Sequence, residues 1–143
     1  MEYNREIIEN IKKEFGLPCY VFDEIAFREN YLRLYDTLGT YYPKYEIAYS
    51  YKTNYAPKLC SIVKEMGGYA EVVSDMEYDI AKTIGYDNEK IVYNGPFKGN
   101  NMEKHLLCGG ILNIDNLEEV NRVIDFAQGY DQIFKVGIRV NIS

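Results

Sequence analysis

The feature that most constrains the fold is a regular alternation of strand-like and helix-like segments. Short apolar runs begin about every 20 to 25 residues, near positions 46, 70, 91, 111 and 136. Apolar residues at helical spacing fill the intervals, over residues 59–66, 76–84, 102–107 and 117–127, and glycines follow these stretches. Parallel strands need long crossovers, which are almost always right-handed, so this alternation predicts an α/β fold with a parallel sheet.

Two architectures agree with this pattern, a doubly wound sheet and part of a (β/α)8 TIM barrel. No GxGxxG or Walker motif follows any strand, which argues against Rossmann and P-loop folds. A complete barrel takes roughly 250 residues, whereas the chain has 143, so about five parallel strands with intervening helices would form a partial barrel. Because such a sheet has two bare edges and one uncovered face, we expect the chain to be a fragment or to assemble with another copy.

The segment before the repeat is predicted to hold two helices and a short strand. An apolar stripe over residues 7–15 predicts the first helix, which Gly16 ends. Cys19–Phe22 is predicted to be a strand. Asp23 is a favoured N-cap residue for the second helix, whose apolar stripe runs over residues 27–38.

Composition excludes several classes of partner. The net charge is −6 and no Lys/Arg cluster is present, so neither nucleic acid nor a membrane surface is expected as a partner. No apolar run approaches the roughly 20 residues of a membrane span, and the charged N-terminus is unlike a signal peptide, so we expect a cytoplasmic protein.

Three widely spaced cysteines and one histidine make no zinc site. We expect buried or half-buried thiols, and His105 on a helix surface.

Three charged residues break the rule that strands of a parallel sheet are apolar throughout. Lys52 ends the first strand, Glu71 lies inside the second and Arg139 inside the last. Charged groups are rarely buried without a partner, and ligands bind at the carboxyl ends of strands in α/β folds. The three positions therefore indicate a ligand site at that edge of the sheet.

Lys52 has two readings at this point. It shares a face with Ala48 and Ser50, which are small, whereas Tyr49 and Tyr51 occupy the opposite face. A lysine in such a pocket can attack a carbonyl carbon as a neutral amine. A lysine at the end of a strand can also simply extend into solvent.

The acidic residues have structural readings as well. Glu71 and Arg139 are expected to form an ion pair across the barrel floor if they have no catalytic role. Ser74 and Glu77 have the spacing of a capping box, so one interpretation of Glu77 is that it caps its helix and has no other role. Asp115–Glu118 has the same pattern and predicts a second acidic helix start.

Six segments, in order along almost the whole chain, resemble motifs of one family. Two of them resemble the Y-A-x-K-A-N and D-V-V-S-x-x-E motifs of diaminopimelate/ornithine decarboxylase-like proteins, which are fold-type III enzymes that use pyridoxal 5'-phosphate (PLP). The six segments are Leu17–Asp23, Ile47–Asn54, Gly68–Ser74 with Glu77, Ile91–Lys98, Ile111–Asp115 and Val136–Asn141.

This resemblance implies that residues 1–143 form the N-terminal portion of a PLP-binding barrel domain of the alanine-racemase-like type. It implies that Lys52 is catalytic and forms the Schiff base with PLP. It also implies that Glu71, Glu77 and Arg139 make up a polar cluster that binds the cofactor. The family usually has Asp at the position of Glu71, so the longer side chain leaves its geometry open.

The resemblance further implies a PLP-dependent decarboxylase (a lyase) that acts on a basic amino acid and forms a homo-oligomer. The family's phosphate loop and its C-terminal β-domain have no counterpart in this sequence, so we expect the chain to be inactive alone. Two alternatives remain open. One is a racemase or PLP-carrier protein on the same barrel, and the other is a non-catalytic half-barrel that self-associates.

Overall fold

A computed structural model describes residues 4–140 and residue 142. The chain divides into two compact units, Met1–Tyr45 and Glu46–Ser143. No helix among the described residues is long and apolar enough to cross a membrane. In the same part of the chain, His, Cys, Asp and Glu side chains form no group that could hold a metal ion.

The first unit contains two capped helices, α1 (Arg5–Phe15) and α2 (Glu24–Tyr41). The Asn4 side chain accepts a hydrogen bond from the amide of Ile7, and the Asp23 side chain accepts one from the amide of Ala26. Gly16 ends α1 with a φ of 77°, a value that strains residues with a Cβ. Both predicted helices and the Asp23 cap are confirmed.

The predicted strand at Cys19–Phe22 is wrong, because these residues are irregular and mostly exposed. A strand needs a neighbouring backbone that satisfies its amide and carbonyl groups. Among the described residues no segment pairs with this one. The local preference of its β-branched and aromatic side chains is therefore not realised.

The second unit is a parallel sheet with its strands in the order β1-β2-β3-β4-β5. The strands are β1 (Ala48–Ser50), β2 (Tyr69–Val72), β3 (Ile91–Tyr93), β4 (Ile111–Ile114) and β5 (Val136–Ile138). The connections carry helices α3 (Pro57–Glu65), α4 (Asp75–Ile84), α5 (Asn101–Leu107) and α6 (Leu117–Ala127), and a 3-10 turn, η1 (Asn88–Lys90).

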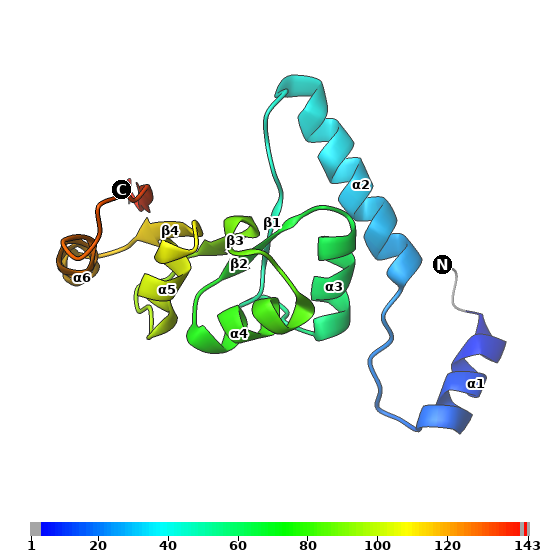
Figure 1. Cartoon of the computed structure of the whole chain (residues 1–143). Helices are drawn as coiled ribbons and strands as arrows, with labels where there is room; N and C mark the ends of the chain where they lie inside the picture. The colour runs from blue at the N-terminus through cyan, green and yellow to red at the C-terminus, as the bar shows by residue number, and fades with distance from the viewer. Residues whose placement is uncertain (1–3, 141, 143) are drawn as a thin grey trace. The chain divides into compact units, whose positions relative to one another are not determined.

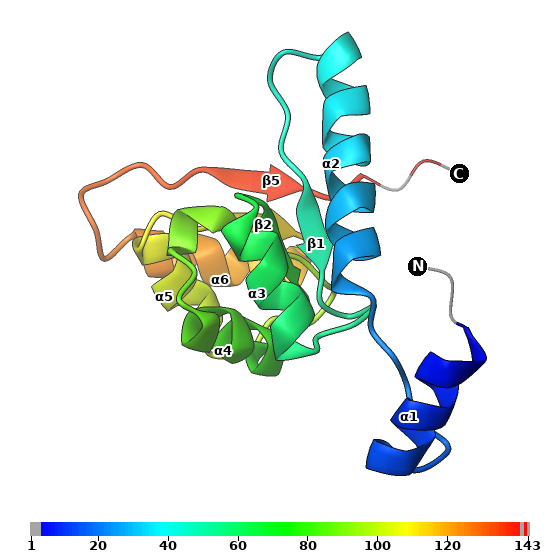
Figure 2. The ribbon, with the colours of Figure 1, turned by 90° about the vertical axis from the view of Figure 1, so that its right-hand side faces the viewer.

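Sequential strand order distinguishes between the two predicted architectures. Right-handed crossovers between successive neighbours place their helices on one side of the sheet, whereas a doubly wound sheet reverses direction and carries helices on both faces. Figures 1 and 2 show α3, α4 and α5 on the same side of the strands. The second unit is thus a partial (β/α)8 barrel with β1 and β5 as its edges, as predicted.

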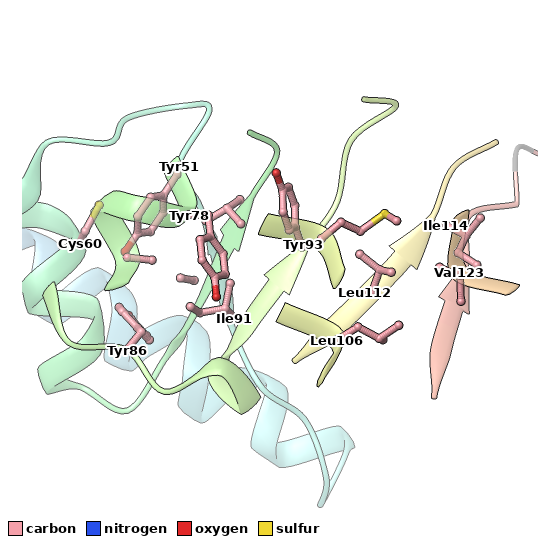
Figure 3. Packing of buried hydrophobic residues seen from close by; sticks show 14 residues of the cluster. Tyr51, Cys60, Tyr78, Tyr86, Ile91, Tyr93, Leu106, Leu112, Ile114 and Val123 are labelled. Atoms are coloured by element: carbon pink, nitrogen blue, oxygen red, sulfur yellow. The ribbon is translucent and has the colours of Figure 1, made fainter. Parts of the chain in front are cut away.

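The hydrophobic core lies between the sheet and these helices. Alternate strand residues such as Val72, Ile91 and Leu112 point toward the helices and are fully buried, and each buried side chain of this size stabilises the fold by about 1.5–3 kcal/mol. Aromatic side chains complete the cluster, and Figure 3 shows Tyr78 and Tyr93 at its centre. The two rings are stacked with centroids 5.9 Å apart.

His105 lies inside this core, so its predicted place on a helix surface is wrong. Its ring meets the rings of Tyr78 and Tyr93 edge-on, and its Nε2 lies 3.2 Å from the carbonyl oxygen of Ile111. Burial lowers the pKa of His105 below its ordinary value. The cysteines also differ from expectation, since only Cys60 is buried and the other two, Cys19 and Cys108, are exposed.

Candidate functional site

A polar cavity of about 490 Å³ lies at the carboxyl ends of the strands in the second unit. Its volume is in the range of small-molecule sites. It is lined by Lys52, Glu71, Val73, Asn94, Gly95, Pro96, Asn113, Asp115, Gly137, Ile138 and Arg139. The prediction that Lys52, Glu71 and Arg139 meet at this edge of the sheet is confirmed, whereas Glu77 is not in the lining.

Lys52 enters the cavity because its neighbour is anchored on the other face. Strand β1 ends at Ser50, and the amide of Thr53 donates to the carbonyl of Ser50 across a turn (3.2 Å). Tyr51 is fully buried in the core, and its amide donates to the carbonyl of Glu71 (2.9 Å). Lys52 is exposed at the cavity, and no described residue forms a hydrogen bond or ion pair with its amine. Its amine is available to a ligand.

Glu71 is held by two neighbours at the cavity floor. One carboxylate oxygen accepts a hydrogen bond from the Ser50 hydroxyl, and the other accepts one from the Asn94 amide nitrogen at 3.0 Å. Arg139 pairs instead with Asp115 at 3.1 Å. The predicted Glu71–Arg139 ion pair is therefore wrong, because Glu71 belongs to β2 and Arg139 follows β5, with two strands between them.

Glu77 acts as a helix cap next to the cavity. Its carboxylate accepts a hydrogen bond from the amide of Val73 at 2.8 Å, and its own amide donates to the Ser74 hydroxyl at 3.3 Å. The predicted capping role is confirmed. Because Val73 lines the cavity, Glu77 supports the site through the backbone.

The second capping box lies one residue later than predicted. Asn116, rather than Asp115, caps α6 by accepting from the amide of Glu119 at 2.9 Å. The carboxylate of Glu119 accepts in return from the amide of Asp115 at 2.9 Å. Asn and Asp are about equally good caps, so the sequence does not distinguish between the two adjacent residues.

A buried ion pair supports the cavity wall from behind. The Lys98 ammonium lies 2.7 Å from the Glu119 carboxylate and also donates to the carbonyl of Gly95 at 2.7 Å. The same carboxylate binds the amide of Asp115. One salt bridge thus connects two parts of the cavity lining, the loop after β3 and the residue after β4.

Sequence reasoning did not identify three polar residues of the lining, Asn94, Asn113 and Asp115. Asn113 lies within β4, and the other two directly follow a strand. They carry the same signal as Lys52 and Glu71, a polar residue at the carboxyl end of a parallel strand. Applying that criterion to uncharged amides as well as charged residues would have identified them.

This arrangement fits a small polar ligand that carries a carbonyl group, because the lining holds two cations, Lys52 and Arg139, and two carboxylates, Glu71 and Asp115. Lys52 supplies an amine that no residue in the described part of the chain binds, and Arg139 and the Asn113 amide supply charge and hydrogen-bonding capacity around the same space. PLP is a ligand of this kind. Lys52 would hold its aldehyde, and the polar lining would hold its ring substituents.

The partial barrel and the cavity that Lys52 borders define a class of protein. Comparison with known families identifies this class. Residues 28–143 match the model of the family described as pyridoxal-dependent decarboxylase, pyridoxal binding domain. The chain belongs to this family.

Individual relatives agree with this assignment. The chain is 30% identical over 129 residues to diaminopimelate decarboxylase of Methanothermobacter thermautotrophicus, which covers 90% of this chain and 29% of the relative. It is 25% identical over 143 residues to L-glutamyl-[BtrI acyl-carrier protein] decarboxylase of Niallia circulans, covering 99% of this chain and 33% of the relative. The chain spans about a third of the length of the curated relatives it matches.

Solved structures share the fold. Diaminopimelate decarboxylase of Methanocaldococcus jannaschii superposes with a TM-score of 0.75 at 28% identity, over 92% of this chain and 32% of that one. The Helicobacter pylori enzyme complexed with L-lysine has a TM-score of 0.81 at 21% identity, over 94% of this chain and 34% of that one.

Proposed function

We propose that residues 1–143 form the N-terminal portion of the PLP-binding barrel domain of a PLP-dependent decarboxylase that acts on a basic amino acid. The observation that carries the proposal is Lys52, whose amine has no partner among the described residues and borders a polar cavity at the carboxyl ends of parallel strands. Membership of the pyridoxal-binding family supports the same cofactor.

In this proposal each site residue has a distinct role. Lys52 is the catalytic residue that binds the cofactor aldehyde, and it later moves a proton at the reacting carbon. Glu71 and Arg139 contact the cofactor from the cavity lining, and Glu77 keeps Val73 in place behind it. Once bound, PLP supplies an electron sink for the pair of electrons that the departing carboxylate leaves.

The substrate class rests on the relatives. The two curated relatives described above are both named as decarboxylases, one of diaminopimelate and one of an L-glutamyl group on a carrier protein. A third, from Selenomonas ruminantium, is named lysine/ornithine decarboxylase. Two of these three names specify amino acids with a second amino group, diaminopimelate and lysine or ornithine, so a basic amino acid is the favoured substrate. We also propose that the whole protein is a cytoplasmic homo-oligomer.

Covalent trapping tests the cofactor role of Lys52. The purified chain is mixed with PLP, reduced with borohydride, and digested for mass mapping. We expect the reduced adduct mainly on Lys52, and its loss in Lys52→Ala. Lys104→Ala, which removes an exposed lysine on α5, is the matched control and should leave the Lys52 adduct unchanged. Adducts scattered over several lysines, and equal in Lys52→Ala, would contradict the proposal.

Competition by amino acids tests the substrate class. An amino acid bound at the site competes through its own amine for the cofactor aldehyde, so it lowers the trapped adduct on Lys52. We expect diaminopimelate, lysine or ornithine to lower it at concentrations at which glutamate does not. Equal competition by glutamate would rule out a preference for basic substrates.

A further inference from the structure

A continuous chain of side-chain hydrogen bonds crosses four strands at the cavity floor. The Ser50 hydroxyl of β1 donates to Glu71 of β2. The amide nitrogen of Asn94, just after β3, donates to the other oxygen of the same carboxylate at 3.0 Å. The amide nitrogen of Asn113 in β4 donates to the amide oxygen of Asn94 at 2.6 Å.

The direction of this relay follows from the chemistry of its members. An ionised carboxylate only accepts hydrogen bonds, whereas an amide group offers a donor at one end and an acceptor at the other. Glu71 therefore requires Asn94 to present its nitrogen. Asn94 must then present its oxygen to Asn113, so both amide orientations are determined by a single negative charge.

The relay ends against β5. A Cβ built on Gly137 would lie only 2.0 Å from the Asn113 amide oxygen, so this oxygen occupies the space where a side chain would otherwise stand. Asn113 and Gly137 are partners in the β4–β5 ladder. Because Gly137 has no side chain, the Asn113 amide has room to lie in this position.

Lys52 borders the same cavity as Glu71. Lys52 stands two residues beyond Ser50 on the same face, and Ser50 and Glu71 are partners in the β1–β2 ladder. Both side chains border the same cavity, yet no ion pair joins them. Each carboxylate oxygen accepts one hydrogen bond, so turning the carboxylate toward the amine would cost these two bonds.

We propose that Asn94 and Asn113 are positioning residues that hold Glu71 away from Lys52 and so keep the Lys52 amine free for covalent attack. A carboxylate in contact with an amine stabilises its charged form, and the charged form is not a nucleophile. The inference rests on the proposed function, since it assigns regulation of the same lysine.

Trace labelling of the apo-chain with acetic anhydride, followed by peptide mass mapping, measures the reactivity of Lys52 without any PLP. We expect Asn94→Ala to release Glu71 toward Lys52. The pH midpoint of Lys52 labelling should then rise by about 1–3 pH units, the range that an opposite charge in contact produces. The double variant Asn94→Ala/Glu71→Gln should restore the midpoint, because the released side chain is then neutral.

Two further variants complete the test. Asn121→Ala, at an exposed position on α6, is the matched control and should leave the midpoint unchanged. Asn113→Ala should move the midpoint in the same direction by a smaller amount, since it removes only the support of Asn94, and it serves if Asn94→Ala does not fold. A midpoint unchanged in the variants that fold, or a shift that Glu71→Gln does not reverse, would overturn the inference.

This readout separates the relay from the cofactor role. If PLP does not mark Lys52 but labelling shifts as described, the relay holds and the proposed function fails. If PLP marks Lys52 and labelling does not shift, the proposed function stands and the relay fails.

Discussion

His105, the single histidine of the chain, is expected to make the stability of the fold depend on pH. Burial is the main cause of its lowered pKa, the charge of Lys82 adds to it, and the carbonyl of Ile111 opposes it. The unfolded chain binds a proton near the ordinary value of 6.5, whereas the folded chain binds it only at lower pH. The contribution of His105 to the free energy of unfolding is therefore fully present above pH 6.5, and it is lost as the pH drops toward the folded pKa.

Urea denaturation between about pH 5 and pH 8 measures this effect. We expect the urea midpoint to fall below pH 6.5, and His105→Gln to flatten that part of the profile. The substitution itself lowers the free energy of unfolding by about 0.5–3 kcal/mol at neutral pH. An unchanged slope in His105→Gln would show that another group causes the dependence.

The Lys98–Glu119 pair predicts a large loss from a single substitution. Its side chains are 0% and 5% exposed, so Lys98→Met leaves a carboxylate buried without a cation. We expect the free energy of unfolding to fall by about 3–5 kcal/mol in a urea titration. Lys98→Met/Glu119→Gln should recover part of this loss because no buried charge remains.

The Arg122–Glu103 pair is the matched control for this prediction. Its side chains are 34% and 31% exposed at an N–O distance of 2.6 Å. Glu103→Gln should therefore cost only about 0–1 kcal/mol. Equal losses in Lys98→Met and Glu103→Gln would mean that burial does not set the strength of these pairs.

At the scale of helices and strands, the caps of α4 and α6 show how sequence signals position the site. Ser74→Ala and Asn116→Ala each remove a side-chain acceptor for a helix amide, so we expect each to lower the free energy of unfolding by about 0.5–2 kcal/mol. Asn100 precedes α5 but makes no side-chain cap bond, and Asn100→Ala should change stability by no more than about 0.5 kcal/mol. Thermal unfolding of the three variants compares them, and a loss in Asn100→Ala equal to the others would contradict the capping argument.

At the scale of the whole molecule, the open sheet predicts self-association. Strands β1 and β5 each pair with one neighbour among the described residues, and Ile138 on β5 is 74% exposed. An unpaired edge with apolar side chains is a template for pairing with another chain. We expect the sedimentation coefficient of the chain to rise with protein concentration.

Lysine substitution locates the associating surface. Ile138→Lys places a charge on the β5 edge and should reduce the association. Leu117→Lys makes the same change at a residue of α6 that is 80% exposed, and should leave the association unchanged. A chain that stays monomeric at all concentrations would contradict this prediction.

Much of the fold follows from the sequence because periodicity depends on near neighbours. Apolar runs at intervals of 20 to 25 residues predicted all five strands and the helices between them. Lys52, Glu71 and Arg139 were recognised because each is a charged residue within or directly next to an apolar, strand-like run, although only Glu71 lies inside a strand of the structure. These inferences depend on residues that are close in the chain, where the geometry of a helix or strand is already known.

Tertiary structure alone decided which of these residues contact one another. Glu71 bonds to Ser50 and Asn94, which are 21 and 23 residues away in the chain, and not to Arg139. His105 is buried because α5 packs its ring against two tyrosines from other elements. Such contacts depend on the order and register of the strands, and register sets which side chains face each other across neighbouring strands. A local pattern does not contain that information, so the sequence determined the elements and the position of the lysine, and only the assembled sheet determined its surroundings.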